Sequence, residues 1–354
     1  MRHVSTRRAW LAGSVAGALG AAQKDTTVRL PRNVRVGLIG LDTHYSEIVD
    51  PLERLSGAEL VAVADPRQKL PSQLAAARHY TDYRRMLDRE KLDVVGVCNT
   101  NGERAEAVLA CLERKLHVAS EKPLALERPT LEQIRRAVER AGVRLTMLLS
   151  MRFEPPYLAM KRVVASGAIG EVAQIDAQKS YQVDERPEWF RHRASYGGTI
   201  PWIGIHMVDL MRWTSGREFA ESVSFQTRIG FPELGDMENV TGSMFRLDNG
   251  GVGMLRMDYL RPKGATSHGD DRLRLAGTRG IVEYQAATGV TLLAGDRAPE
   301  VVHELPPRDS LFIDFLKSIY LGTSPALTQA DVFRVNEIVL LARESAERRQ
   351  IVRL

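Results

Sequence analysis

The sequence of 354 residues is poor in cysteine and aromatic residues and has no long apolar run. Its two cysteines, Cys98 and Cys111, are too few for a disulfide framework. No apolar stretch reaches the roughly 20 residues that a membrane-spanning helix needs. Repeats and low-complexity tracts are also missing, while the hydrophobic (44%) and charged (26%) fractions are ordinary. These features exclude a disordered chain, a collagen-like protein and a coiled-coil rod, and the length predicts two globular domains.

Most of the net positive charge comes from the first 22 residues, so the rest of the chain has little excess charge. The 49 Lys and Arg residues against 44 Asp and Glu residues give a formal net charge of +5. Three of the arginines lie in residues 1–22, where there is no acidic residue, so the rest of the chain carries only +2. A balance this small gives no reason to expect nucleic acid or an anionic membrane as a partner.

Residues 1–22 have the pattern of an export signal. Arg7 and Arg8 precede Trp10 and Leu11 in a short apolar stretch of small residues that ends before a polar segment. Paired arginines before an aromatic residue resemble a twin-arginine signal, which a dedicated export machinery recognises. We therefore expect a periplasmic or extracellular protein after signal removal, with residues 23–33 as a linker. The alternative is a cytoplasmic protein whose leader contains the arginine pair by chance.

Strand-like and helix-like segments alternate between residues 34 and 149. Strands are predicted at 34–40, 59–64, 92–97 and 117–119, and helices at 44–56, 105–112 and 131–141. This alternation favours a parallel, doubly wound Rossmann-like sheet. In such a sheet the ligand lies at the carboxyl ends of the strands, where the strand order reverses.

The loop at 40–45 occupies the place of a G-x-G-x-x-G dinucleotide fingerprint. Only Gly40 is kept, because Asp42 and Tyr45 stand where the other glycines would be. Helix amides after Thr43 would still receive a phosphate, and Asp65 ends the second strand, where a carboxylate accepts ribose hydroxyls. The alternative is that Asp42 caps a helix and Asp65 belongs to a turn. The loop alone does not decide between them.

The second half has strand patterns without intervening helices. Strands are predicted at 172–177, 242–247 and 253–259, with a hairpin signal at 248–251 and two closing helices that include Phe312 and Val332. Successive strands of this kind predict an antiparallel sheet. Its face could contact substrate or a second subunit.

Several stretches resemble the Gfo/Idh/MocA family, named after glucose–fructose oxidoreductase, inositol dehydrogenase and rhizopine catabolism. One is Glu121-Lys122-Pro123-Leu124, and the similarity runs from Val34 to Leu354. The other matching stretches are 36–40, 61–65, 93–101, 151–155, 165–170, 187–190, 197–209, 277–280 and 342–352. The resemblance implies a dinucleotide-binding domain over 34–149. It also implies a C-terminal α/β domain over 150–354 with a large open, mainly antiparallel sheet.

The resemblance further implies a catalytic pair. Lys122 would lie beside the nicotinamide, where its ammonium group polarises the reacting oxygen and exchanges a proton. His206 matches the family's acid/base histidine, whereas Trp202 replaces the aspartate that the family has four residues earlier. That substitution exchanges a charge for an aromatic wall. Asp209 either orients the imidazole or stabilises the first turn of a helix.

Two sets of candidate binding residues follow. The cofactor set is Gly40, Asp42, Thr43, His44, Asp65, Asn99, Asn101, Glu121 and Lys122. The substrate set is Arg152, Tyr181, Trp202, His206 and Asp209. The cofactor is NAD or NADP, and Asp65 favours NAD because it would repel a 2′-phosphate. Arg104 in place of a family histidine, and the missing glycines, argue against an ordinary exchangeable cofactor and leave open a tightly retained one, an altered binding mode or complete loss of cofactor binding. The histidines lack metal-ligand spacing, so no metal is expected.

The sequence thus predicts an exported NAD(P)-dependent oxidoreductase that moves a hydride to or from a hydroxyl carbon of a sugar, inositol or related polyol. Two alternatives remain open at this stage. One is a redox-neutral lyase or glycosidase that uses retained NAD. The other is a non-catalytic carbohydrate-binding relative with a decayed dinucleotide site. A homo-oligomer formed through the C-terminal sheet is expected.

Overall fold

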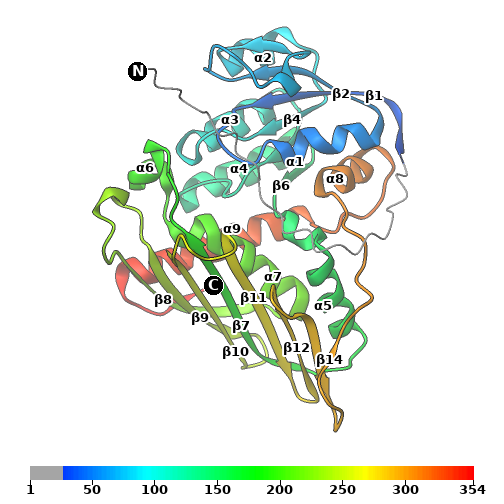
Figure 1. Ribbon diagram of the computed structural model, residues 1–354. Helices are drawn as coiled ribbons and strands as arrows, with labels where there is room; N and C mark the ends of the chain where they lie inside the picture. The colour runs from blue at the N-terminus through cyan, green and yellow to red at the C-terminus, as the bar shows by residue number, and fades with distance from the viewer. Residues whose placement is uncertain (1–26) are drawn as a thin grey trace, which may run out of the picture.

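The computed structural model describes residues 27–354, so the predicted export signal lies outside the described residues. The N-terminal domain contains a six-stranded parallel sheet in the order β3-β2-β1-β4-β5-β6 (Figure 1). Its strands are β1 (Val28–Ile39), β2 (Leu55–Ala64), β3 (Arg78–Tyr80), β4 (Val94–Val97), β5 (His117–Ser120) and β6 (Leu145–Met147). The order reverses between β1 and β4, and the ligand crevice of a doubly wound sheet opens at that point. The predicted topology is confirmed.

The first strand begins earlier than the sequence suggested. Val28 pairs with Leu55 and Arg29 with Ser56, after which the ladder is interrupted until Val34 pairs with Ala58. Residues 28–33 of the predicted linker therefore belong to β1. The prediction missed them because Pro31 and the charged residues around it obscure the strand pattern.

The helix after the first strand is much shorter than the predicted 44–56. The α-helix α1 covers only Ser46–Val49, and a 3-10 helix follows at Asp50–Arg54. Pro51 accounts for the break, because proline has no N–H to donate and its ring clashes with the preceding turn. The other helices of this domain are α2 (Tyr83–Arg89), α3 (Asn101–Glu113) and α4 (Arg128–Ala141).

The C-terminal domain contains a nine-stranded sheet in the order β14-β13-β12-β11-β7-β10-β9-β8-β15. Neighbouring strands are antiparallel except β7 and β10, which are parallel. The strands are β7 (Val172–Gln182), β8 (Phe219–Thr227), β9 (Val240–Leu247), β10 (Val252–Arg261), β11 (Gly269–Gly277), β12 (Gly280–Gln285), β13 (Gly289–Ala294), β14 (Glu300–Val301) and β15 (Val352–Arg353). The mainly antiparallel sheet expected from the sequence is thus present.

Helices cover one face of this large sheet. They are α5 (Pro155–Ala165), which packs on β12 and β13, α7 (Ile205–Ser215), which packs on β7, and α9 (Gln329–Arg348), which packs on β8. A short helix α6 (Arg193–Tyr196) lies against α3 of the first domain. Among residues 27–354, no helix combines the length and apolar character required to cross a membrane.

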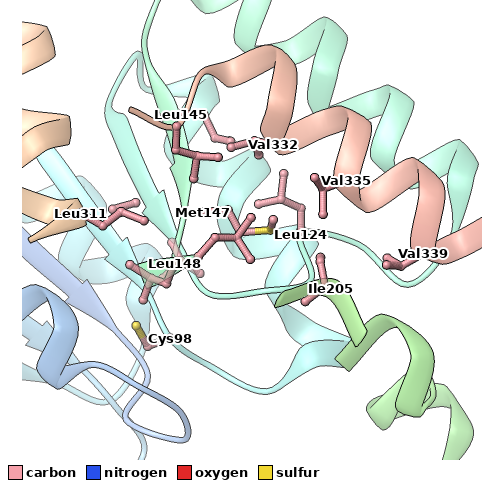
Figure 2. Close-up of a cluster of buried hydrophobic side chains, with 14 of the residues drawn as sticks. Cys98, Leu124, Leu145, Met147, Leu148, Ile205, Leu311, Val332, Val335 and Val339 are labelled. Carbon is pink, nitrogen blue, oxygen red and sulfur yellow. The ribbon is translucent and has the colours of Figure 1, made fainter. Parts of the chain in front are cut away.

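The two domains share one hydrophobic core. Figure 2 shows Met147 of β6 and Leu124 at the centre of a cluster that also includes Ile205 of α7 and Val332 and Val335 of α9. The helix α8 (Leu311–Tyr320) also crosses over and packs on β1 and α1 (Figure 1). The segment after β5 is tied to α9, because the backbone N–H of Leu124 donates to Asn336 Oδ1 at 2.9 Å, two residues after Lys122.

Candidate active site

Lys122 lies in the buried turn that follows β5. Its side chain is only 2% exposed, and its Nζ donates a hydrogen bond to the Trp202 carbonyl at 3.1 Å. The same nitrogen lies 3.1 Å from the centroid of the Trp202 ring. Burial lowers the pKa of Lys122 to about 7, against the opposing charge of Glu121. Both protonation states are therefore populated near neutral pH, as proton exchange requires.

Trp202 and His206 lie on consecutive turns of one helical segment. A π-helical turn, Ile200–Gly204, leads into α7, and residues four apart share a face. Gly204 between them allows close approach to β10, because a Cβ there would lie 2.7 Å from the sulfur of Met257. π-helical turns occur often at functional sites. The structure thus brings both predicted residues to the Lys122 region.

His206 has a free nitrogen. Its Nδ1 is buried and has no hydrogen-bond partner among the described residues. Burial and the nearby charge of Lys122 lower the pKa of His206 well below its usual value. A neutral imidazole with an unpartnered nitrogen is suited to bind a substrate hydroxyl.

An aromatic wall surrounds Trp202. The rings of Trp189 and Phe190 meet it edge to face, with centroid distances of 5.7 Å and 5.4 Å. His44 stacks on it at 6.5 Å with an interplanar angle of 24°. The aromatic surface predicted for Trp202 therefore includes two further rings from residues 189–190. The sequence signal for them was the Pro-Glu-Trp-Phe stretch at 187–190.

Lys179 of β7 is a site residue that the sequence analysis missed. Its side chain is buried, and its Nζ donates to Asp271 Oδ2 at 2.7 Å. The Nζ also lies 4.9 Å from the ring centroid of Tyr181, a predicted substrate residue. Its charge helps to lower the pKa of both Lys122 and His206. The only sequence signal was a lysine in register with the inward residues of a strand.

Glu121 connects the Lys122 turn to the glycine loop. One carboxylate oxygen contacts His44 Nδ1 at 2.5 Å, and the other accepts the backbone N–H of Lys122 at 2.8 Å. Although burial opposes ionisation, the charges of His44 and Lys122 lower the pKa of Glu121 to about 2. Glu121 therefore orients its neighbours, and its two oxygens are already occupied within the protein.

Glu47 is a second carboxyl group in this region that the sequence analysis missed. It accepts a hydrogen bond from Ser150 Oγ at 2.8 Å, while its other oxygen is buried and has no partner in the part of the chain that the structure describes. Burial raises the pKa of Glu47 to about 7. No sequence motif marks it, because its hydrogen-bond partner Ser150 lies 103 positions away.

Arg104 supports the Lys122 turn from below. It is completely buried and donates to the carbonyls of Lys122, Pro123 and Asn99 at 2.8, 3.1 and 2.6 Å. It also binds Asn101 Oδ1 at 2.8 Å, while Asn101 Nδ2 donates to the Tyr196 carbonyl. Asn101 was predicted to bind the cofactor, but both ends of its amide are used within the protein. The structure assigns it to the contact between α3 and α6.

The carboxyl edge of the Rossmann sheet retains three features that fit a dinucleotide. Gly40 turns the chain with φ +76°, and a Cβ there would lie 2.5 Å from the Asn99 backbone. Asp65 lies buried at the end of β2, and the backbone N–H of Leu41 donates to it at 2.9 Å. Asn99 Oδ1 is a buried acceptor that has no hydrogen-bond partner within residues 27–354. These residues could hold NAD in the crevice between β1 and β4.

Two loop residues differ from their predicted roles. Thr43 Oγ1 donates to the Cys98 carbonyl at 2.9 Å, so its hydroxyl fixes the loop. The expected phosphate site at the following helix is not supported, because α1 has only four residues. Asp42 forms its ion pair with Arg67, at 2.7 Å.

Arg152 and Asp209 were predicted to bind substrate, but in the structure they bind each other. Their buried ion pair is two-pronged, with N–O distances of 2.7 and 2.5 Å. Arg152 also donates to the Ala326 carbonyl at 2.8 Å and contacts Asp331 at 3.3 Å. Asp209 therefore does not orient His206. The long-range pairing that explains both residues is invisible in the local sequence.

Comparisons with known proteins agree with this geometry. Residues 34–149 match the family described as "Oxidoreductase family, NAD-binding Rossmann fold", and residues 157–283 match the "GFO/IDH/MocA C-terminal domain". The chain is 25% identical over 341 residues to myo-inositol 2-dehydrogenase from Thermotoga maritima, covering 91% of this chain and 98% of that protein. The N-terminal domain is thus an NAD-binding Rossmann domain, and the chain is an oxidoreductase.

Solved structures show the same architecture. A Thermotoga maritima structure described as an oxidoreductase is 32% identical, with a TM-score of 0.86 over 91% of this chain and 100% of that chain. Levoglucosan dehydrogenase in complex with NADH, at 20% identity, shares the fold with a TM-score of 0.79 over 91% of this chain and 99% of that chain.

Proposed function

The chain belongs to the Gfo/Idh/MocA oxidoreductase family, and on that premise we propose that it transfers a hydride between NAD and a CH–OH carbon of inositol or a related sugar or polyol. The observation that carries the proposal is the pair formed by Lys122 and His206. One is a buried amine with a pKa near 7, and the other is a neutral imidazole with an unpartnered nitrogen. The likeness to myo-inositol 2-dehydrogenase supports the substrate class.

In alcohol oxidation, one residue of this pair would accept the proton and the other would bind the hydroxyl. NAD, when bound, supplies the hydride acceptor. Neutral Lys122 takes the hydroxyl proton as the carbonyl forms, and His206 holds the hydroxyl by a hydrogen bond. The ring of Trp202 stabilises the resulting ammonium group through its π face. Trp202 and Tyr181 also offer aromatic surface for the C–H face of a sugar ring.

The pH dependence of NADH formation tests this proposal. With myo-inositol and a panel of sugars as substrates, the rate of oxidation should rise with pH and level off above about 7, because only neutral Lys122 accepts the proton. The measurement is NADH absorbance at saturating NAD. Absence of NADH with every polyol would contradict the dehydrogenase proposal. Cleavage of a glycoside without net NADH would support the redox-neutral alternative instead.

We also propose that the protein is exported in folded form by the twin-arginine route. The support is the sequence of residues 1–22, with its Arg7-Arg8 pair and short apolar stretch. Replacing both arginines by lysine should retain the full-length protein in the cytoplasm, because the export machinery reads the pair. Cell fractionation followed by immunoblotting measures the outcome. Equal export of the unchanged and the Lys-Lys chains would contradict this route.

The uncovered face of the nine-stranded sheet supports the proposal of a homo-oligomer. Phe225 is 66% exposed and Met244 is 49% exposed, and they line a shallow cavity with Val223 and Met254. Large exposed apolar patches of this kind often mark protein interfaces. Met244→Arg should shift the protein toward monomer in analytical ultracentrifugation. Leu321→Arg, at an exposed apolar residue that follows α8 and lies away from this sheet, is the control and should leave the mass unchanged. An unchanged mass for Met244→Arg would show that this face does not pair.

A further inference from the structure

The dinucleotide loop lacks the usual means of receiving a pyrophosphate. A long helix after the glycine loop normally directs several N–H groups and a positive dipole end at the phosphates. Here α1 has one turn, and the backbone N–H of Asp42 is bound to the Cys98 carbonyl at 3.2 Å. Asp42 also adds a negative charge where a glycine is expected. Some other group must therefore offset the charge if NAD is to bind.

Arg67 is the group in position to do so. Its guanidinium bridges the two carboxylates of this edge, at 2.7 Å from Asp42 Oδ1 and 2.6 Å from Asp65 Oδ2. Among the described residues it is the only ion-pair partner of Asp42. Two carboxylates and one guanidinium leave one net negative charge at the edge. Without Arg67 the ionised pyrophosphate would approach two uncompensated acids.

The Arg67 guanidinium lies nearer the solvent than the Asp65 carboxylate. The Arg67 side chain is 46% exposed, whereas the Asp65 side chain is fully buried. Asp65 also accepts the backbone N–H groups of Leu41 and Arg67, both at 2.9 Å. These two bonds hold the carboxylate independently of the guanidinium. A ribose hydroxyl could therefore replace the guanidinium on Asp65 without disturbing that carboxylate.

We propose that Arg67 takes over the role of the missing glycines. It neutralises Asp42, and it provides the cationic contact for the dinucleotide once a ribose hydroxyl has replaced the guanidinium on Asp65. This inference rests on the proposed function only in that NAD must bind. It assigns a binding role to a residue that lies outside the glycine loop and two positions after Asp65. It also explains how an acidic residue can persist in that loop.

A double-mutant cycle tests the assignment by NADH binding, measured by fluorescence titration and calorimetry without any substrate. Arg67→Ala should weaken NADH binding about tenfold, because two acids then face the phosphates. Asp42→Asn should tighten NADH binding several-fold, because it removes a negative charge near the phosphates instead of a positive one. The double variant should return to within about threefold of the unchanged protein, because Asp65 alone gives this edge the same net charge as Asp42, Asp65 and Arg67 together.

Salt and a matched control sharpen the result. Added salt should improve binding to Arg67→Ala and weaken binding to Asp42→Asn, because it screens repulsion in the first and attraction in the second. Lys69→Ala, which removes an exposed cation from the same loop, should leave binding unchanged. If the unchanged protein does not bind NADH, the proposed function fails. If it binds and Arg67→Ala binds equally or more tightly, the role of Arg67 is refuted. Recovery in the double variant excludes misfolding as the cause.

Discussion

Replacing Lys122 by alanine is expected to lower kcat for polyol oxidation about a thousandfold, while the dissociation constant for NADH changes little. The amine is buried, has a pKa of about 7 and contacts Trp202 through both the backbone carbonyl and the ring. Positioned acid–base groups contribute typically about 10²–10⁴-fold to a rate. NADH binding should persist because the loop, Asp65 and Asn99 are untouched. Steady-state kinetics and a fluorescence titration of NADH measure the two quantities separately.

Lys122→Arg distinguishes proton exchange from simple charge. A guanidinium keeps the positive charge and can still polarise an oxygen, but it does not accept a proton at neutral pH. If Lys122 exchanges the proton, this variant should be nearly as slow as Lys122→Ala, and the pH rise near 7 should disappear from its profile. A Lys122→Arg variant with most of the original rate and the same pH profile would show that another group takes the proton.

The fold could be predicted from the sequence because the patterns that mark strands and helices are local. The four predicted parallel strands are short apolar runs, and the predicted helices at 105–112 and 131–141 repeat their apolar residues on one face. The short strands β3 and β6 and the helix α2 were not predicted. The Lys122 turn also carries a contiguous motif at 121–124. The structure confirms both the doubly wound sheet and the mainly antiparallel sheet. The predicted length of the first helix, 44–56, was wrong because Pro51 ends α1. Proline is also a local signal, but the prediction gave more weight to the helical pattern around it.

The site was harder to predict because its contacts cross large sequence distances. Lys179 meets Asp271 across 92 positions, and the carbonyl that binds Lys122 Nζ lies 80 positions away. Arg104 was noted only as a departure from the family pattern, yet it fixes the backbone of the Lys122 turn. Spacing along the chain does not encode such pairs. They arise from the pairing of β7 with β11 and from the contact between the Ile200–Gly204 turn and the segment after β5.

The expected cost of breaking the buried ion pair shows why its residues serve the fold. Asp209→Ala would leave the Arg152 guanidinium, 2% exposed, with Asp331 and one carbonyl as its remaining partners. Removing one partner of a buried pair typically costs about 3–5 kcal/mol, because an uncompensated charge stays in the interior. The midpoint of thermal unfolding should therefore fall by about 5–10 °C, as measured by calorimetry. KM for the polyol should change little in the protein that remains folded.

The double variant Arg152→Met with Asp209→Leu separates this structural role from substrate binding. Removing both charges spares the desolvation that the single variant suffers, so much of the lost thermal stability should return. Arg217→Ala, which removes a partly exposed ion pair with Glu171 just beyond α7, is the control and should shift the midpoint by no more than about 1–2 °C. If Asp209→Asn instead raised KM strongly at unchanged thermal stability, the ion pair would belong to substrate recognition. Asp209 would then bind substrate together with Lys122 and His206, as predicted from the sequence.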